Sequence, residues 1–209
     1  MAANARITMT ASSKMPTRHG DFQLYSFRSD NDPALPEPHL ALVTGLSTRV
    51  VPLVRVHSEC ITGDVFGSLR CDCGNQLDAA LSMIAARGAG LLIYLRQEGR
   101  GIGIENKLKA YQLQESGLDT AEANEALGLP VDARDYQAAA WLLKYWKIHR
   151  CQLLTNNPGK MIALENQGIT IDRVVTLQMP GQHHFCETYL ETKRLKFGHL
   201  IERTKKQAG

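Results

Sequence analysis

The sequence predicts a single α/β domain, in which a mixed β-sheet is flanked by helices. β-rich or apolar stretches mostly interleave with stretches of helical periodicity, as is typical of this class. Two β-rich stretches, 40–45 and 51–57, lie so close in the chain that they predict neighbouring strands and therefore a mixed sheet. The 209 residues, 44% of them hydrophobic, can fill one sizeable core, and no repeat or linker divides them.

The individual elements follow from local patterns. Strands are expected where β-branched, aromatic or aliphatic residues gather between turn signals, at 21–27, 40–45, 51–57, 90–95, 151–155 and 169–177. Helices are expected where apolar residues recur at helical spacing, at 76–88, 106–117, 118–128, 134–146, from the 156–160 turn to about 167, and at 187–201. Gly88 and Gly117 are placed to end two of these helices.

The remaining segments are expected to be irregular. The proline-rich stretch 29–39, the glycine-rich stretch 96–103 and residues 180–185 predict loops. Residues 1–14 are expected to be a disordered leader, 15–203 the folded domain and 204–209 a polar tail.

Composition and charge argue against several classes of function. Lys plus Arg number 24 against 21 Asp plus Glu, and the net charge of +3 argues against general binding of nucleic acid. No apolar run approaches the roughly 18 residues needed to span a membrane, and the N-terminus has no signal-peptide core. We therefore expect a cytoplasmic protein without a membrane or nucleic-acid partner, in which a local basic pocket could still hold one phosphorylated small molecule.

A cysteine cluster dominates the stretch from Arg55 to Gln76. Cys60, Cys71 and Cys73 lie there, just after a predicted strand, and such a cluster in a reducing compartment is typical of a metal or catalytic site. Three thiolates predict a zinc site with a position left for water, whereas a fourth ligand, His57, would make a closed structural site. The spacing alone leaves both arrangements open, together with a cluster that holds no metal.

A zinc site with an open position predicts hydrolysis. Zinc can lower the pKa of a bound water to about 7, and electron-poor ring carbons of nucleobases are one class of target. The Cys-x-x-Cys spacing of zinc deaminases is absent here. Glu59 and Asp64, on either side of Cys60, either move protons and orient substrate or are ordinary surface carboxylates.

Other stretches suggest anion binding. RQEGRGIG, at 96–103, combines glycines that let N–H groups approach an anion with arginines that match phosphate geometry, although a solvated turn is the alternative. Glu98 within it could ligate magnesium or accept hydrogen bonds from a guanine edge. Lys160, at a predicted helix start, is a further candidate. Asp132 and Arg134 either cap the following helix or carry chemistry.

Four sequence segments, in this order, resemble the GTP cyclohydrolase II family: RVHSECITGDVFGSLRCDCGNQL, RQEGRGIG-x-x-NK, DARDY and LLTNNPGK. The resemblance runs from about Met15 to Leu200. It implies hydrolysis of GTP that opens the imidazole ring at C8 and releases formate and pyrophosphate, the first step of riboflavin synthesis. The implied product is a diaminopyrimidinone carrying a phosphoribosylamino group. One Zn²⁺ per chain, Mg²⁺ with the triphosphate and a homodimer are implied as well.

The resemblance also implies roles for single residues. Cys60, Cys71 and Cys73 match the zinc ligands, and Tyr111 matches a tyrosine tied to ring opening. Arg134 matches an arginine proposed to attack the α-phosphate, with Asp132 as its base. Because a guanidinium is almost always protonated, stabilising charge on the phosphoryl group is the alternative role. The residues implied to bind GTP are Arg55, Val56, His57, Ser58, Glu59, Gln76, Glu98, Gly99, Arg100, Thr120, Thr155 and Lys160.

Two segments depart from the family pattern, the opening segment and GQHHFCETYLETK at 181–193. The family tends to have asparagines where His184 and Cys186 lie, in the segment 180–188, which leaves dimer contacts and substrate preference open. Two other functions are therefore kept in view. The chain could open the ring of another nucleotide or base, or it could be a non-catalytic nucleotide-binding protein with a structural zinc.

Overall fold

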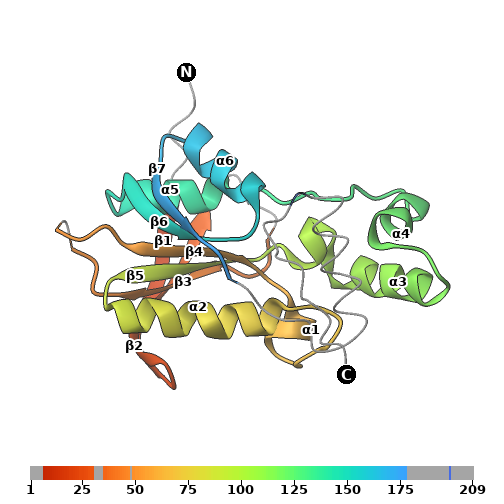
Figure 1. The fold of residues 1–209 in the computed structure, drawn as a ribbon, viewed down its shortest axis with the longest axis horizontal. Helices are drawn as coiled ribbons and strands as arrows, with labels where there is room; N and C mark the ends of the chain where they lie inside the picture. Colours follow the sequence, from red (N-terminus) through yellow and green to blue (C-terminus); the bar gives the residue numbers. More distant parts are fainter. Residues whose placement is uncertain (1–6, 31–34, 48, 178–197, 199–209) are drawn as a thin grey trace, which may run out of the picture.

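A computed structural model of the chain describes residues 7–30, 35–47, 49–177 and 198. A seven-stranded sheet runs through it in the order β1-β2-β3-β5-β4-β6-β7 (Figure 1). Its strands are β1 (Ile7–Thr17), β2 (Gly20–Ser29), β3 (His39–Thr44), β4 (Leu53–Ser58), β5 (Gly90–Leu95), β6 (Arg150–Leu154) and β7 (Thr170–Val175). Strands β1, β2, β3 and β5 pair antiparallel, whereas β5, β4, β6 and β7 pair in parallel. The expected mixed α/β sheet is confirmed.

The helices cover both faces of this sheet. They are α1 (Ile61–Asp64), α2 (Cys73–Arg87), α3 (Gly103–Glu115), α4 (Thr120–Ala126), α5 (Gln137–Tyr145) and α6 (Pro158–Asn166), with a 3₁₀ turn η1 (Glu98–Gly101) before α3. Figure 1 shows α2 along one face, α5 and α6 on the other, and α3 with α4 beyond the end of the sheet. The last pair is therefore free to form one wall of a cavity.

Strand β5 shows why the sheet needs helices on both sides. Side chains alternate along a strand, and this strand is apolar at nearly every position. Leu91 and Ile93 pack in one core with Leu143 of α5, while Leu92 packs in a second core with Ile84 of α2. All five side chains are fully buried. The continuous apolar run therefore marks a central strand between two helical layers.

Local signals fix several helix ends. Gly88 ends α2 in the left-handed conformation, with φ of 69°, as expected. Asp119 caps α4 and forms a reciprocal capping box with Glu122. Asn157 caps α6 ahead of Pro158, which occupies the first turn. Helix α5 begins at Gln137 rather than 134, so the alternative in which Asp132 caps it is wrong.

Two expectations about the fold are wrong. Residues 7–14, expected to belong to a disordered leader, form most of β1, because pairing with β2 satisfies the backbone of a polar segment. The stretches at 40–45 and 51–57 form strands but are not neighbours, since β5 lies between β3 and β4. The β4–α2–β5 crossover places β5 there.

The helix expected at 187–201, the loop at 180–185 and the tail at 204–209 lie outside the described residues, apart from residue 198. Among the helices that the structure describes, none combines the length and the apolar character that crossing a bilayer requires.

Candidate active site

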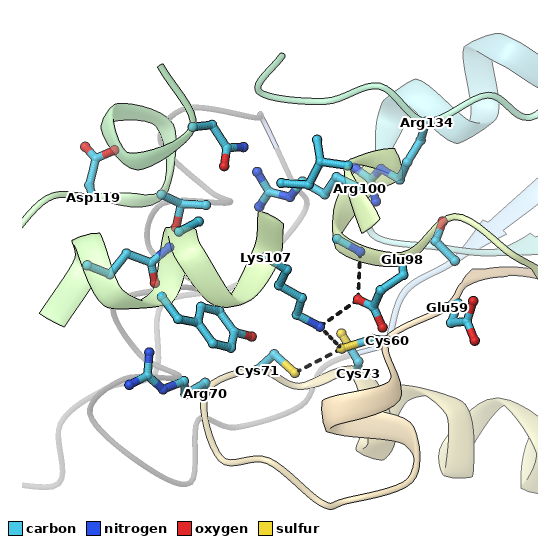
Figure 2. A pocket seen from close by; sticks show the side chains of 18 of the residues that line it. Glu59, Cys60, Arg70, Cys71, Cys73, Glu98, Arg100, Lys107, Asp119 and Arg134 are labelled. Carbon is cyan, nitrogen blue, oxygen red and sulfur yellow. Dashed lines mark hydrogen bonds and ion pairs between the residues drawn. The ribbon is translucent and has the colours of Figure 1, made fainter. Parts of the chain in front are cut away.

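The site lies where two parallel strands end. Because β4 and β5 are parallel, their carboxyl ends meet at one edge of the sheet, a common position for ligand sites in α/β folds. Cys60 follows β4, and the turn η1 follows β5. A cavity of about 370 Å³ opens there between these loops and helices α3 and α4 (Figure 2). Its volume is in the range of small-molecule sites.

The three cysteines meet on the wall of this cavity. Their sulfur atoms all lie within 4.8 Å of one another, and those of Cys60 and Cys71 are 3.7 Å apart. Cys60 immediately precedes α1, and Cys73 is the first residue of α2. The chain turns at Asp72, between Cys71 and Cys73. This turn lets the sulfur atoms of Cys71 and Cys73 reach the same point.

Two glycines make room for the sulfur atoms. A Cβ on Gly63 would lie 2.9 Å from Cys71 Sγ, and a Cβ on Gly74 would lie 2.3 Å from the Gly63 carbonyl oxygen. Larger residues at these positions would push α1 away from α2. Three thiols held this closely form a donor set that suits zinc. Within the described residues, His57 is not part of the cluster.

His57 belongs instead to a buried network behind the cluster. Its Nε2 lies 3.1 Å from both carboxylate oxygens of Asp64, which also accepts hydrogen bonds from the Cys60 N–H and the Tyr94 hydroxyl. The imidazole stacks on the Tyr94 ring, with centroids 5.5 Å apart. Burial lowers the pKa of His57, although Asp64 opposes this effect. The network holds the backbone at Cys60, and Asp64 is not a surface carboxylate.

Lys107, which the sequence reasoning did not single out, reaches the cluster from α3. Its ammonium donates to Cys60 Sγ at 3.1 Å, Thr62 Oγ1 at 2.9 Å and Glu98 Oε1 at 2.8 Å. Hydrogen bonds from the neighbouring thiols and the charge of Lys107 lower the pKa of Cys60. Glu98 also accepts hydrogen bonds from the N–H groups of Ile61 and Gly99, so both of its oxygens are engaged by the protein.

One face of α3 lines the cavity. Lys107, Ala110, Tyr111 and Gln114 follow the i, i+3, i+4, i+7 spacing of a helix face, and this signal could have identified Lys107 from the sequence. The Tyr111 ring faces the guanidinium carbon of Arg70 at 4.7 Å. Burial raises the pKa of the Tyr111 phenol, so it stays protonated at neutral pH.

Asp132 and Arg134 lie at another part of the cavity. The Arg134 Nε donates to Asp132 Oδ1 at 2.8 Å, a second guanidinium nitrogen bonds the other oxygen, and Arg134 lines the cavity. Burial raises the pKa of Asp132, but the hydrogen bonds and charge of Arg134 outweigh this and lower it. The loop rests on the segment before α3, because the Ala133 N–H donates to the Arg100 carbonyl and the Asp135 N–H donates to Gln97 Oε1.

Several residues implied to bind GTP are buried and do not line the cavity. Arg55 is buried, donates to the Leu154 carbonyl and to Gln76 Oε1, and has its pKa lowered by burial to about 10. Gln76 in turn donates to Asp72, between two of the cysteines. Lys160 is also buried, and its ammonium donates to the Val56 carbonyl at 2.8 Å. These contacts hold both cationic side chains against groups inside the protein.

The structure thus divides the sequence-predicted site residues into two groups. Those that line the cavity are Cys60, Cys71, Cys73, Ser58, Glu59, Glu98, Gly99, Arg100, Tyr111, Thr120 and Arg134. Those that do not line it are Arg55, Val56, His57, Gln76, Asp132, Thr155 and Lys160. Asp132 is paired with Arg134, which does line the cavity.

Comparison with known proteins identifies close relatives. Residues 8–176 match the model of a family described as GTP cyclohydrolase II. A riboflavin biosynthesis protein RibBA of Salinispora tropica is 51% identical over 198 residues, covering 94% of this chain and 48% of its own length. RibBA of Bacillus subtilis is 53% identical over 190 residues, covering 90% and 46%. The chain spans about half the length of the curated relatives it matches.

A solved structure shows a weaker similarity. RibBX of A. baumannii, described as a two-domain 3,4-dihydroxy-2-butanone 4-phosphate synthase, is 20% identical with a TM-score of 0.44 and covers 83% of this chain and 40% of that one.

Proposed function

Because this chain belongs to the GTP cyclohydrolase II family, we propose that it hydrolyses GTP in a zinc-dependent reaction. The reaction opens the imidazole ring at C8 and releases formate and pyrophosphate. The product is a diaminopyrimidinone that carries a phosphoribosylamino group. The names of the RibBA relatives support a role at the first step of riboflavin synthesis.

The observation that carries this proposal is that one cavity borders both the cysteine cluster and Arg134. The three cysteines lie on one part of its wall, and Arg134 lies on another. Figure 2 shows the cluster and Arg134 on different sides of Lys107 and Glu98. A nucleotide in this cavity would reach thiol ligands with its base and a cation with its phosphates. This arrangement suits one substrate that is cleaved at two places.

Cys60, Cys71 and Cys73 would hold one zinc ion per chain. When bound, zinc with three protein ligands supplies a water made nucleophilic near neutral pH. Tyr111, whose phenol stays protonated, would orient a water or donate a hydrogen bond at the reacting ring. The raised pKa argues against a role as a base at pH 7.

Arg134 would bind the phosphate chain. Its guanidinium is paired with Asp132 and so is held in a fixed orientation with its charge intact. A protonated guanidinium stabilises charge on a transferring phosphoryl group and is a poor nucleophile. We therefore favour the charge-stabilising role over direct attack. Arg100, also on the cavity wall, adds a second cation, and Mg²⁺ would accompany the triphosphate.

The test is incubation of the zinc-loaded protein with GTP and magnesium, followed by mass spectrometry of the nucleotides. We expect GTP to be replaced by the ring-opened monophosphate product. GTP that stays intact would contradict the proposal. Parallel reactions with ATP and other nucleoside triphosphates separate it from a relative that opens a different ring.

We also propose a homodimer with one zinc per chain, as the family resemblance implies. Light scattering coupled to gel filtration, with metal analysis of the same fraction, should give twice the chain mass and one zinc per chain. A monomer that turns over GTP would contradict the dimer and leave the proposed reaction standing.

A further inference from the structure

Lys107 occupies an unusual position for a lysine. Only 10% of its side chain is exposed, and the ammonium lies against the cysteine cluster (Figure 2). Each ammonium has three N–H donors, and three acceptors surround this one: Cys60 Sγ, Thr62 Oγ1 and Glu98 Oε1. The position of the charge is therefore defined by the surrounding residues.

An ordinary buried ion pair does not account for this arrangement. A pair with Glu98 needs no third partner, and burying such a pair costs desolvation free energy that its attraction often fails to recover. Here both Lys107 and Glu98 form hydrogen bonds with the segment that begins at Cys60. Lys107 contacts Cys60 and Thr62, while Glu98 accepts the Ile61 N–H at 2.6 Å. The pair thus fixes Cys60, the one cysteine of the cluster that lies outside α2 and the turn before it.

The contact between Lys107 and Cys60 also affects the charge of the cysteine cluster. Three thiolates around a divalent cation leave one excess negative charge, and an uncompensated charge in a poorly solvated site is costly. The Lys107 ammonium, 3.1 Å from Cys60 Sγ and also bonded to Glu98, places a positive charge directly against these thiolates. A charged N–H donor also withdraws electron density from the sulfur. The bound metal would then keep more of its positive charge for activating water.

We propose that Lys107 is a positioning residue of the cysteine centre, which holds the Cys60 sulfur in place for zinc and keeps a positive charge against the three thiolates. The inference rests on the proposed function, because it requires zinc at Cys60, Cys71 and Cys73. Partners of metal ligands typically change metal affinity or activity by about 10- to 100-fold when they are removed. Zinc affinity is accordingly the property that Lys107 should control.

The experiment measures zinc affinity by competition with a chromophoric chelator, on purified protein. Lys107→Met removes the charge and keeps much of the side-chain length, and we expect it to weaken zinc binding by about 10- to 100-fold. Lys107→Arg keeps the charge and should restore a large part of the affinity. Lys109→Met, at an exposed position of the same helix, is the matched control and should leave the affinity unchanged.

Cobalt substitution adds a readout that is independent of turnover. The sulfur-to-cobalt charge-transfer bands of Lys107→Met should keep the intensity of three thiolates and change in energy. A role confined to folding would lower the stability of the metal-free protein and leave the affinity of its folded form and the spectrum unchanged. If Lys107→Met does not fold, Lys107→Gln, which can still bond Glu98 and Thr62, takes its place in both measurements.

Two results would overturn the inference, and they are distinguishable. Unchanged zinc affinity and an unchanged cobalt spectrum in the folded neutral variant refute the role of Lys107, while the proposed function stands. A parent protein that binds no zinc refutes the proposed function and the role of Lys107 together.

Discussion

The cysteine cluster and the Asp132–Arg134 loop border the same cavity but are held in different ways. The cluster receives support from α1, α2, α3 and the turn η1, through the close approach of Gly63 and the hydrogen bonds of Lys107. The loop contains an ion pair, and its backbone N–H groups make one hydrogen bond to the Gln97 side chain and one to the Arg100 carbonyl. The proposed metal centre thus faces the loop that we propose to bind phosphate, and this loop has fewer supports. Substitutions in the two regions should affect different products.

The largest effect is expected from Cys71→Ser. Loss of one of three thiolates should remove zinc and reduce formate release to below about one-thousandth, because the activated water is lost with the metal. Formate and bound zinc are measured on the same sample, and Cys151→Ala, in the core away from the cluster, is the control. Undiminished formate release without zinc would refute a catalytic metal. Loss of folding in place of activity would favour a structural one.

A smaller and more selective loss is expected from Arg134→Gln. Pyrophosphate release should fall by about 100- to 1,000-fold, the range for removing one donor that stabilises transition-state charge. Zinc content should not change, since Arg134 lies on a different part of the cavity wall from the cysteines (Figure 2). Pyrophosphate is measured by a coupled enzymatic assay. Arg150→Gln, which breaks the ion pair with Asp172 on another part of the surface, is the matched control.

The opposite selectivity is expected from Tyr111→Phe. Loss of the phenol should slow ring opening by about tenfold, the worth of one hydrogen bond made in the transition state. Pyrophosphate release should change less, and Tyr145→Phe, at an exposed position, serves as the control. If both products fall equally in Tyr111→Phe, the two regions do not act on separate steps.

The smallest effect is expected from a change of pH on the free energy of unfolding. It should involve the buried His57 behind the cysteine cluster and not Asp132 in the loop. Burial lowers the folded-state pKa of His57, so below about pH 6.5 the unfolded chain takes up a proton that the folded protein does not. The free energy of unfolding should therefore fall with acidification below this point, by up to about 1.4 kcal/mol per pH unit. Asp132 keeps its charge here, because Arg134 holds its pKa below the usual value.

Denaturant unfolding of the metal-free protein between pH 5 and pH 7.5 measures this dependence. His57→Gln should flatten it, while His149→Gln, at an exposed position, should not. An equal slope in His57→Gln and the parent would show that the buried imidazole does not govern acid sensitivity.

Local patterns predicted the elements better than their arrangement. The apolar run 90–95 and the helical spacing up to Gly88 reflect burial and backbone geometry that act within a few residues. The place of β5 between β3 and β4 depends on a crossover through α2, which no local propensity encodes. Strand β1 was missed because its polar sequence shows no apolar alternation and is stabilised by pairing with β2.

The candidate site was predictable where chemistry concentrates in sequence. Three cysteines within 14 positions indicated a candidate metal site, and the structure brings their sulfur atoms together. Lys107 lies in the matched segment RQEGRGIG-x-x-NK but was given no role, because a single lysine on a helix is usually solvated. Its spacing with Tyr111 on one helix face was a usable signal, and its contact with Cys60, 47 residues away, shows its role in the structure. Arg55 and Lys160 show the converse limit. The resemblance implied that both bind GTP, and in the structure both are buried and donate to backbone carbonyls, which the sequence pattern alone did not indicate.

The stoichiometry of formate and pyrophosphate from a single GTP reaction tests most directly whether the two regions act on one substrate. With zinc and magnesium present, we predict equal molar amounts of both products for each GTP consumed. Pyrophosphate released at full turnover without formate, or neither product from zinc-loaded protein, would contradict the account.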